Sequence, residues 1–261
     1  MNILFIGDIS GRAGREAFQR HFLPAVERHR IDFSIANVEN AAGGFGVTAP
    51  LLEEFFDAGL DVLTSGNHVW DRNDAGAVLE NEPRLLRPEN YPSPAPGRGV
   101  CVCGERLPVP VAVINLQGRV FMESIDCPFA AADRLLADEA REAPVVLVDF
   151  HAEATSEKVA MGWHLDGRVS AVLGTHTHIQ TADERVLPQG TAYITDVGMT
   201  GPYDSVIGMR RDAAMERFLT GRPKRLSAAR GDARFAGVVI TVEEATGRAT
   251  AIERLMLTAS G

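Results

Sequence analysis

The sequence predicts an α/β protein with parallel strands, and three observations support that class. Short apolar runs alternate with helical segments in the order βαβαβ over the first 64 residues, which is the pattern of a sheet with helices packed on its faces. Polar side chains follow five of the apolar runs directly, at the position where open α/β sheets bind ligands. Hydrophobic residues make up 45% of the 261 residues, and no Ser-, Pro- or charge-rich linker divides them. We therefore expect a single domain over residues 1–261.

The first two strands each lead to an acidic residue. An apolar run at residues 2–6 precedes Asp8 in a glycine-rich turn, and a helix is expected from about residue 15 to 30. The turn lacks both the dinucleotide-binding fingerprint and the Lys-Ser/Thr ending of a P-loop, so we expect its glycines to free the backbone around Asp8. A second strand at residues 33–38 ends at Glu39 and Asn40. Two strand ends thus present oxygen donors.

The third strand ends at Asn67 and His68. Thr48 and Pro50 open a helix through residue 58 by their N-cap and first-turn preferences, and a strand at residues 60–63 follows. Gly-Asn-His is ordinary turn chemistry in isolation, so it indicates a site only if other strands deliver ligands to the same edge. A short helix at residues 73–79 and a proline-rich irregular surface segment at residues 82–96 come next.

The rest of the chain alternates in the same way. Strands are expected at residues 99–102, 109–116, 144–150 and 169–173, with helices at 129–141 and 156–165. The strand at residues 144–150 is followed by His151, and the strand at 169–173 is followed closely by His176 and His178. Later strands at residues 191–195, 237–242 and 250–257 surround a helix near 210–219. We expect the C-terminal strands to form a second sheet packed on the first.

The polar residues at the five strand ends predict a metal site. They offer oxygen and nitrogen donors without a thiolate, and they include four of the seven histidines of the chain. The five strand ends carry Asp8, Glu39 with Asn40, Asn67 with His68, His151, and His176 with His178. A single histidine of this kind is more often a core or turn residue, but the whole set is not expected to gather by accident. His164, beside Trp163, could reach a substrate but is more often a packing residue.

Composition excludes several classes of function. A net charge of −9 and a pI near 5.3 argue against a surface that tracks duplex nucleic acid, whereas a small phosphate ester fits once bound cations reverse the local field. The apolar runs are far shorter than the roughly 20 residues of a membrane span, and the N-terminus lacks the pattern of a signal peptide. Three cysteines suit a reducing compartment, so we expect a cytoplasmic protein; Cys101 and Cys103 are interpreted as half-buried strand residues.

The motifs at these strand ends resemble those of the calcineurin-like metallophosphoesterases. Gly7-Asp8, Glu39-Asn40, Gly66-Asn67-His68, His151 and Gly174-Thr-His-Thr-His178 occur in the family's order over nearly the whole chain. The chain departs from the usual superfamily pattern at two positions, with Ser10 in place of a histidine and Glu39 in place of an aspartate. In both departures it resembles the bacterial YmdB-like subfamily. The resemblance implies a four-layer α/β/β/α sandwich of two mixed sheets flanked by helices, a dinuclear metal centre, and phosphodiesterase activity that includes 2′,3′-cyclic nucleotides.

The resemblance also implies a role for each residue. The first metal would take Asp8, Glu39, Asn40 and His178, with Asn40 filling the place left by Ser10, and the second would take Glu39, Asn67, His151 and His176. Glu39 would bridge the two ions, and a hydroxide between them would attack phosphorus in line. His68 would donate a proton or hydrogen bond to the leaving oxygen.

Asp71 is either an orienting partner of His68 or the N-cap of the next helix, and the N-cap is the favoured interpretation. The ligand set suits iron, manganese or zinc. The resemblance favours iron, alone or mixed with manganese.

Two other functions remain open. One is a phosphomonoesterase or phosphoprotein phosphatase, and the other is a metal-stabilised regulatory protein with weak hydrolysis. Intact ligands together with His68 argue against the regulatory protein, because a scaffold would need the metals but not that proton donor. The resemblance favours the phosphodiesterase, acting on a small substrate such as a cyclic nucleotide. The sequence does not indicate the oligomeric state, the physiological substrate, or whether His164 or the loop at residues 196–202 touches substrate.

Overall fold

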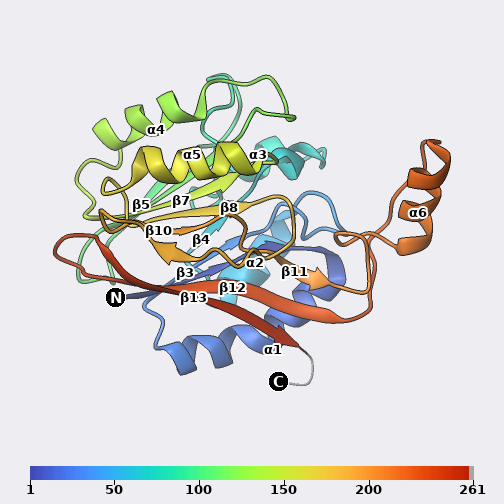
Figure 1. Cartoon of the computed structure of the whole chain (residues 1–261), viewed down its shortest axis with the longest axis horizontal. Coiled ribbons are helices and arrows are strands. Elements are labelled where there is room, and N and C mark those ends of the chain that lie inside the picture. The colour runs from blue at the N-terminus through green and yellow to red at the C-terminus, as the bar shows by residue number, and fades with distance from the viewer. Residues whose placement is uncertain (259–261) are drawn as a thin grey trace.

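The computed structural model describes residues 1–258 and contains four layers in the order helix, sheet, sheet, helix (Figure 1). Helices α4 and α5 cover one outer face, and α1 covers the opposite outer face. The four-layer sandwich implied by the sequence motifs is therefore confirmed. The helices are α1 (Gly11–His29), α2 (Ala49–Asp57), α3 (Ala75–Asn81), α4 (Pro128–Ala137), α5 (Thr155–Leu165) and α6 (Arg211–Thr220), with a short 3₁₀ helix η1 (Asn67–Trp70).

The first sheet has the strand order β2-β11-β12-β1-β3-β4, and a seventh strand, β13, also pairs with β12. Strands β1, β3 and β4 are parallel, as the βαβαβ pattern predicts, and β12 lies antiparallel to β1. Its strands are β1 (Asn2–Ile6), β2 (Asp8–Ile9), β3 (Phe33–Asn37), β4 (Val62–Thr64), β11 (Met199–Pro202), β12 (Ala233–Val242) and β13 (Ala249–Thr258).

The second sheet has the order β5-β6-β7-β8-β10-β9, with β6, β7, β8 and β10 parallel. Like the first sheet it is mixed, because the edge strands β5 and β9 are antiparallel to their neighbours. Its strands are β5 (Val100–Cys103), β6 (Val111–Gln117), β7 (Val145–His151), β8 (Ala171–Thr175), β9 (Arg185–Val186) and β10 (Ala192–Ile194).

The prediction that the C-terminal strands form the second sheet holds for β10 and was wrong for β12 and β13. Strands β12 and β13 complete the first sheet, in which Asn2 lies opposite Thr241, and the second sheet is built from the middle of the chain. The antiparallel pairing of β12 with β1 joins residues almost the whole chain apart. Hydrophobic periodicity is a local signal, so it does not indicate which distant strand will pair with a given strand.

Two local predictions also need correction. Helix α1 begins at Gly11 rather than near residue 15, with Ser10 at its N-cap. The segment at residues 82–96 is irregular as predicted, but it lies on the surface only in part, with residues 92–94 exposed. In its first part Leu85 and Leu86 are fully buried, and Leu85 forms a parallel bridge with Leu63 of β4.

Three apolar cores hold the layers together. Alternate residues of β1, such as Ile3 and Phe5, pack between the sheets against Val113 and Leu147 of the second sheet. The other face of the first sheet packs on α1 and α2, and the other face of the second sheet packs on α4 and α5. Strands with both faces buried hold their carboxyl ends firmly in place, which suits a site built there. Within residues 1–258 no helix is both long and apolar enough to cross a membrane.

Candidate metal centre

The structure gathers all seven predicted metal ligands where the carboxyl ends of strands from both sheets meet. Asp8 lies in β2, Glu39 and Asn40 follow β3, Asn67 begins η1 after β4, His151 ends β7, and the two remaining histidines follow β8. Asp8, Glu39 and His151 have no exposed surface. The role of all seven residues as metal ligands remains a prediction. The seven are Asp8, Glu39, Asn40, Asn67, His151, His176 and His178.

One group of donors surrounds Nε2 of His151. Oε1 of Glu39 lies 3.1 Å from this nitrogen, and Oδ1 of Asn67 lies 3.1 Å from it. Nδ1 of His176 lies 3.0 Å from the same nitrogen. The ligand atoms of Glu39, His151 and His176 all fall within 4.8 Å of one another, close enough to share a cation. These are the four residues expected at the second metal.

The other three expected ligands, Asp8, Asn40 and His178, form an adjoining group that shares Glu39 with the first. Nε2 of His178 lies 3.8 Å from Oδ1 of Asp8 and 3.3 Å from the amide nitrogen of Asn40. The same amide nitrogen is 3.2 Å from Oε1 of Glu39. Because the oxygen and nitrogen of a side-chain amide are interchangeable by a 180° rotation, Asn40 can present its oxygen here. Glu39 thus touches both groups.

The hydrogen bonds of the three histidines leave one nitrogen of each ring facing the cluster. Nδ1 of His151 lies 2.9 Å from the Thr175 hydroxyl, which itself donates to Asp149. Nδ1 of His178 donates to the carbonyl of Ile207, and Nε2 of His176 lies 3.2 Å from Glu153. Each partner accepts a proton from one nitrogen and so directs the lone pair of the other inward, as in metal-ligating histidines.

Asp8 supplies a second sign that the residues fit a cation. Its Oδ1 is buried and, within residues 1–258, accepts no hydrogen bond. Burial raises the pKa of Asp8, and the neighbouring Glu39 acts in the same direction. A buried carboxylate oxygen without a donor is costly, and a bound cation would satisfy it.

The turn that carries His176 and His178 is strained and firmly held. Both residues have positive φ, at 97° and 67°, which is uncommon outside glycine. Between them, the backbone N–H and hydroxyl of Thr177 donate to buried Asp196, which also accepts a hydrogen bond from the buried Lys158. Strain of this kind persists only where surrounding contacts over-determine it, and it is common at functional sites.

Gly66 allows the first and second sheets to approach each other at the centre. A Cβ on this residue would lie 2.1 Å from Cδ2 of His151, so any side chain would displace the imidazole. The glycine before Asn67 is therefore required by close packing rather than by its backbone angle.

His68 lies beside the cluster and makes contacts different from those of the ligands. Its backbone N–H donates to Oε2 of Glu39 at 2.9 Å, and its Nδ1 lies 2.7 Å from Asp71. The N-cap interpretation of Asp71 was wrong, because α3 begins after Asp74, whereas Asp71 ends η1 and contacts Nδ1 of His68. The ring packs at 5.1 Å from that of Phe45, in a loop that Arg72 holds by donating to the carbonyls of Ala42 and Phe45.

Sequence reasoning missed the residues that support the ligands from behind. Buried Asp149 accepts hydrogen bonds from Asn37 and Thr64 of the first sheet and from Thr175 of the second. The sequence offered one signal for Asp149. It is an acidic residue within an apolar strand, and it lies two positions before His151 and therefore on the same face of the sheet.

The structure shows the surroundings of His164 and of the loop at residues 196–202, the two regions whose contact with substrate the sequence did not indicate. His164 pairs with Asp133 of α4 at 2.9 Å, on the outer face of α5. In the loop at residues 196–202, Asp196 supports the histidine turn, and β11 pairs with β2 beside Asp8. Both regions therefore have structural contacts of their own.

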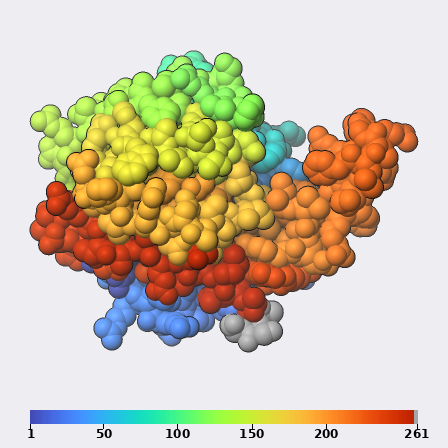
Figure 2. All heavy atoms as spheres, viewed as in Figure 1, coloured from blue at the N-terminus to red at the C-terminus, as the bar shows by residue number. Residues whose placement is uncertain are grey.

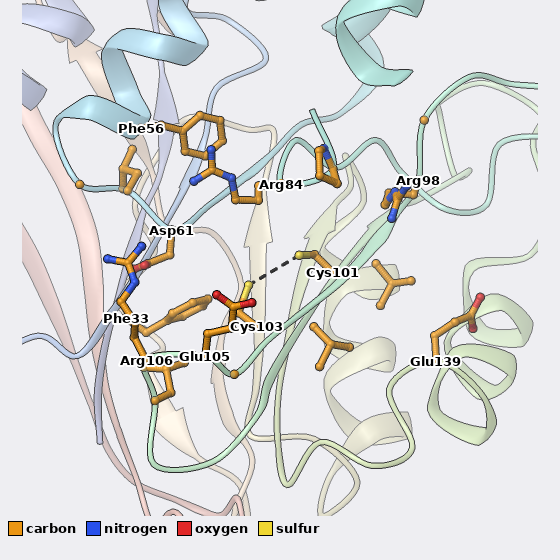
Figure 3. A pocket seen from close by; sticks show the side chains of 18 of the residues that line it. Phe33, Phe56, Asp61, Arg84, Arg98, Cys101, Cys103, Glu105, Arg106 and Glu139 are labelled. Atoms are coloured by element: carbon orange, nitrogen blue, oxygen red, sulfur yellow. Dashed lines mark hydrogen bonds between the residues drawn. The ribbon is translucent and has the colours of Figure 1, made fainter. Parts of the chain in front are cut away.

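A cavity of about 1020 Å³ lies at the opposite, amino-terminal ends of β3 and β4 (Figure 3). The Arg84 guanidinium stacks 3.7 Å from the ring centroid of Phe56 there, and the sulfurs of Cys101 and Cys103 lie 3.6 Å apart. Both cysteines are partly buried residues of β5, as predicted. No third His, Cys, Asp or Glu of residues 1–258 completes a metal site with them.

Comparisons with known proteins agree with this geometry. A relative from Bacillus subtilis, a 2′,3′-cyclic-nucleotide 2′-phosphodiesterase, is 47% identical over 98% of this chain and 97% of its own length. A hypothetical protein from Thermus thermophilus has a crystal structure with a TM-score of 0.92, 46% identity and 99% coverage of both chains. A phosphatase from Mycoplasma pneumoniae superposes with a TM-score of 0.93 at 32% identity, covering 99% of this chain and 93% of its own. A family model described as YmdB-like protein matches residues 4–255, and this chain belongs to that family.

Proposed function

We propose that this chain is a metal-dependent phosphodiesterase that hydrolyses 2′,3′-cyclic nucleotides by breaking the bond between phosphorus and the 2′ oxygen. The observation that carries the proposal is the set of three histidines, each anchored through one nitrogen and facing Glu39 and its neighbours with the other. The activity of the B. subtilis relative supplies the substrate class.

The seven donors would hold two ions, with Asp8, Glu39, Asn40 and His178 at one and Glu39, Asn67, His151 and His176 at the other. When bound, such ions supply the positive charge that neutralises phosphate oxygens and activates the attacking water. Carboxylate, amide and imidazole donors suit iron, and we propose iron alone or with manganese, while zinc is also compatible. We place the protein in the cytoplasm on the strength of its three free thiols.

Residues of this chain perform the proton chemistry. Nδ1–H of His68 donates to Asp71, which leaves Nε2 to face the substrate, and the His68 side chain is 32% exposed and so accessible. A protonated His68 would give its Nε2 proton to the 2′ oxygen as the bond to phosphorus breaks. Asp71 holds the ring in place and stabilises its positive charge. The product is a 3′-phosphate.

A substrate panel on metal-reconstituted protein tests the proposal. The chelated protein is loaded separately with iron, manganese or zinc and assayed with 2′,3′-cyclic AMP, 3′,5′-cyclic AMP, bis-p-nitrophenyl phosphate and p-nitrophenyl phosphate. We expect metal-dependent conversion of 2′,3′-cyclic AMP to 3′-AMP. Faster turnover of p-nitrophenyl phosphate would instead indicate a phosphomonoesterase, and two bound metals without turnover would indicate a regulatory protein.

A further inference from the structure

A projecting arm, residues 207–230, rises directly from the rim of the metal centre. At its base the carbonyl of Ile207 accepts a hydrogen bond from Nδ1 of His178, and a Cβ on Gly208 would lie 3.1 Å from Ser10 Oγ. The chain returns beside its starting point, where Ala229 N–H donates to the carbonyl of Gly208. Between these points α6 stands away from the body as a separate lobe (Figures 1 and 2).

The arm is positively charged on a strongly negative molecule. It holds seven Arg and Lys residues and two acidic residues, a net charge of +5, whereas the whole chain carries −9. The remaining residues therefore carry −14. Four arm arginines form no ion pair with any of residues 1–258, and all four are exposed: Arg217, Arg222, Arg225 and Arg230.

An exposed aromatic side chain lies among these cations. Phe218 is 77% exposed and follows Arg217 on α6, and Arg222 comes just after the helix ends. Cations that follow a phosphate backbone, with an aromatic ring on which a base can stack, are the combination that binds single-stranded nucleic acids. A duplex would also have to lie against the body from which the arm projects, and the net charge of −14 outside the arm repels phosphate.

We infer that the metal centre acts on the 3′ end of a single-stranded RNA that carries a 2′,3′-cyclic phosphate, with the arm binding the nucleotides that precede this end. The inference rests on the proposed function. The terminal ribose would occupy the centre, and the strand would leave through its 5′ oxygen toward the arm. DNA lacks the 2′ oxygen and cannot form the ring.

The chemistry of the ring also identifies the reaction that must supply this substrate. A 2′,3′-cyclic phosphate forms when a ribose 2′ oxygen attacks the adjacent 3′ phosphodiester and expels the 5′ oxygen of the next nucleotide. RNA cleavage by this internal transesterification therefore precedes the reaction here. The present reaction adds water across the bond between phosphorus and the 2′ oxygen, and it leaves a 3′-phosphate and a 2′-hydroxyl.

The test compares two substrates that end in the same nucleotide. Metal-loaded enzyme is assayed with 2′,3′-cyclic AMP and with a five-nucleotide RNA whose 3′-terminal adenosine carries the cyclic phosphate. We expect kcat/KM to be at least about tenfold higher for the RNA and to fall as salt is raised. Arg217→Ser/Arg222→Ser/Arg225→Ser should remove this advantage, and Phe218→Ser should lower kcat/KM for the RNA about 5- to 100-fold. Neither change should alter hydrolysis of 2′,3′-cyclic AMP.

A matched control removes the same charge elsewhere. Arg20→Ser/Arg28→Ser/Arg141→Ser alters three exposed arginines outside the arm, on α1 and after α4, and should leave both rates unchanged. Equal kcat/KM for the two substrates in the wild-type enzyme would overturn the inference and leave the proposed function standing, whereas no turnover of either would refute the proposed function itself.

A second copy of the chain is the rival occupant of the arm. Met215, Phe218 and Leu219 form an exposed apolar row at helical spacing, which a second copy could bury. If arm variants lower the sedimentation coefficient and weaken both substrates alike, the arm is a contact between copies and the RNA inference is wrong.

Discussion

The expected role of His68 rests on contacts of both its backbone and its side chain. Its backbone N–H binds Glu39, the carboxylate shared by both ligand groups, while its ring is held by Asp71 and packed against Phe45. The neighbouring Asn67 faces His151 instead. These contacts fit the proposed division of two adjacent residues between metal binding and proton transfer.

Replacing His68 with Ala should separate these two roles. The variant should keep both metals and its fold but lose roughly 10²- to 10⁴-fold in rate on 2′,3′-cyclic AMP, since the ribose oxygen needs a proton to leave. Loss on bis-p-nitrophenyl phosphate should be much smaller, because p-nitrophenolate is stable as an anion. Elemental analysis and both assays check this. Equal losses with metals retained would make His68 an orienting residue, and loss of an ion would make it a ligand.

Glu39→Gln should weaken both metal sites together. The carboxylate is fully buried and its Oε1 touches His151 of one group and Asn40 of the other, so one substitution removes the charge that both ions would share. Metal content per chain and activity should fall in parallel. Two ions retained per chain would rule out the bridge.

At the scale of elements, Asp149 joins strands of both sheets beneath the centre. Thr175 of β8 passes this contact on to His151, because its hydroxyl donates to Asp149 and accepts from Nδ1 of the imidazole. Strand register therefore determines the direction in which the His151 lone pair points.

Thr175→Val should remove this orientation while preserving shape. We expect metal affinity to fall about 10- to 100-fold, the usual cost of losing an outer partner of a ligating histidine. Thr191→Val is the matched control, since Thr191 is equally buried but bonds the carbonyls of Leu165 and Val169. Metal titration should distinguish the two variants, and equal affinities would show that the Thr175 contact does not orient His151.

The side-chain contact between His151 of β7 and Glu39, which follows β3 of the first sheet, also predicts a pH effect in metal-free protein. Burial acts to lower the pKa of His151, but the carboxylates of Glu39, Asp8 and Asp149 outweigh it and raise that pKa to about 9. Because this value lies above the ordinary 6.5, the charged ring contributes stability fully below pH 6.5, and the contribution is lost as pH rises through 9.

Chelated protein should therefore melt at progressively lower temperature from pH 6.5 to 9. Metal-loaded protein should not show this loss, because the cation takes the place of the proton on His151. Thermal melts of both forms across this range provide the measurement. Parallel curves would show that His151 does not exchange a proton for metal.

Local pattern was enough to predict the strands that carry the ligands, but not all their partners. Apolar runs followed by Asp8, Glu39 and His151 placed three ends correctly, because burial on both faces leaves a clear signature in each run. The two-residue β2 and the joining of β12 to β1 left none. Asp71 was misassigned because an acidic residue before a helix is compatible with a cap, and only the η1 turn brings it to His68.

For the whole molecule, the shared core between the sheets predicts cooperative unfolding. Ile3 and Phe5 of one sheet and Leu147 of the other belong to one cluster, so neither sheet can bury its inner face alone. We therefore propose that the chain unfolds as one domain. The two tryptophans report on different halves, since Trp70 follows β4 and Trp163 lies on α5.

Single-tryptophan variants Trp70→Phe and Trp163→Phe should give coincident urea transitions in chelated protein. The measurement is fluorescence of each variant against circular dichroism of the same sample. Midpoints that differ between the two reporters would divide the chain into two separately folding units.

The position of β12 between β1 and β11 constrains how the protein is made on the ribosome. Strand β1 emerges first, yet the neighbour that covers one of its edges is not synthesised until residues 233–242. The nascent chain therefore carries an apolar strand with one open edge through most of its translation, since β3 can pair only with the other edge. A premature stop near the end would leave that edge open permanently. Since Asp8 follows this strand, we expect metal loading to await release of the finished chain.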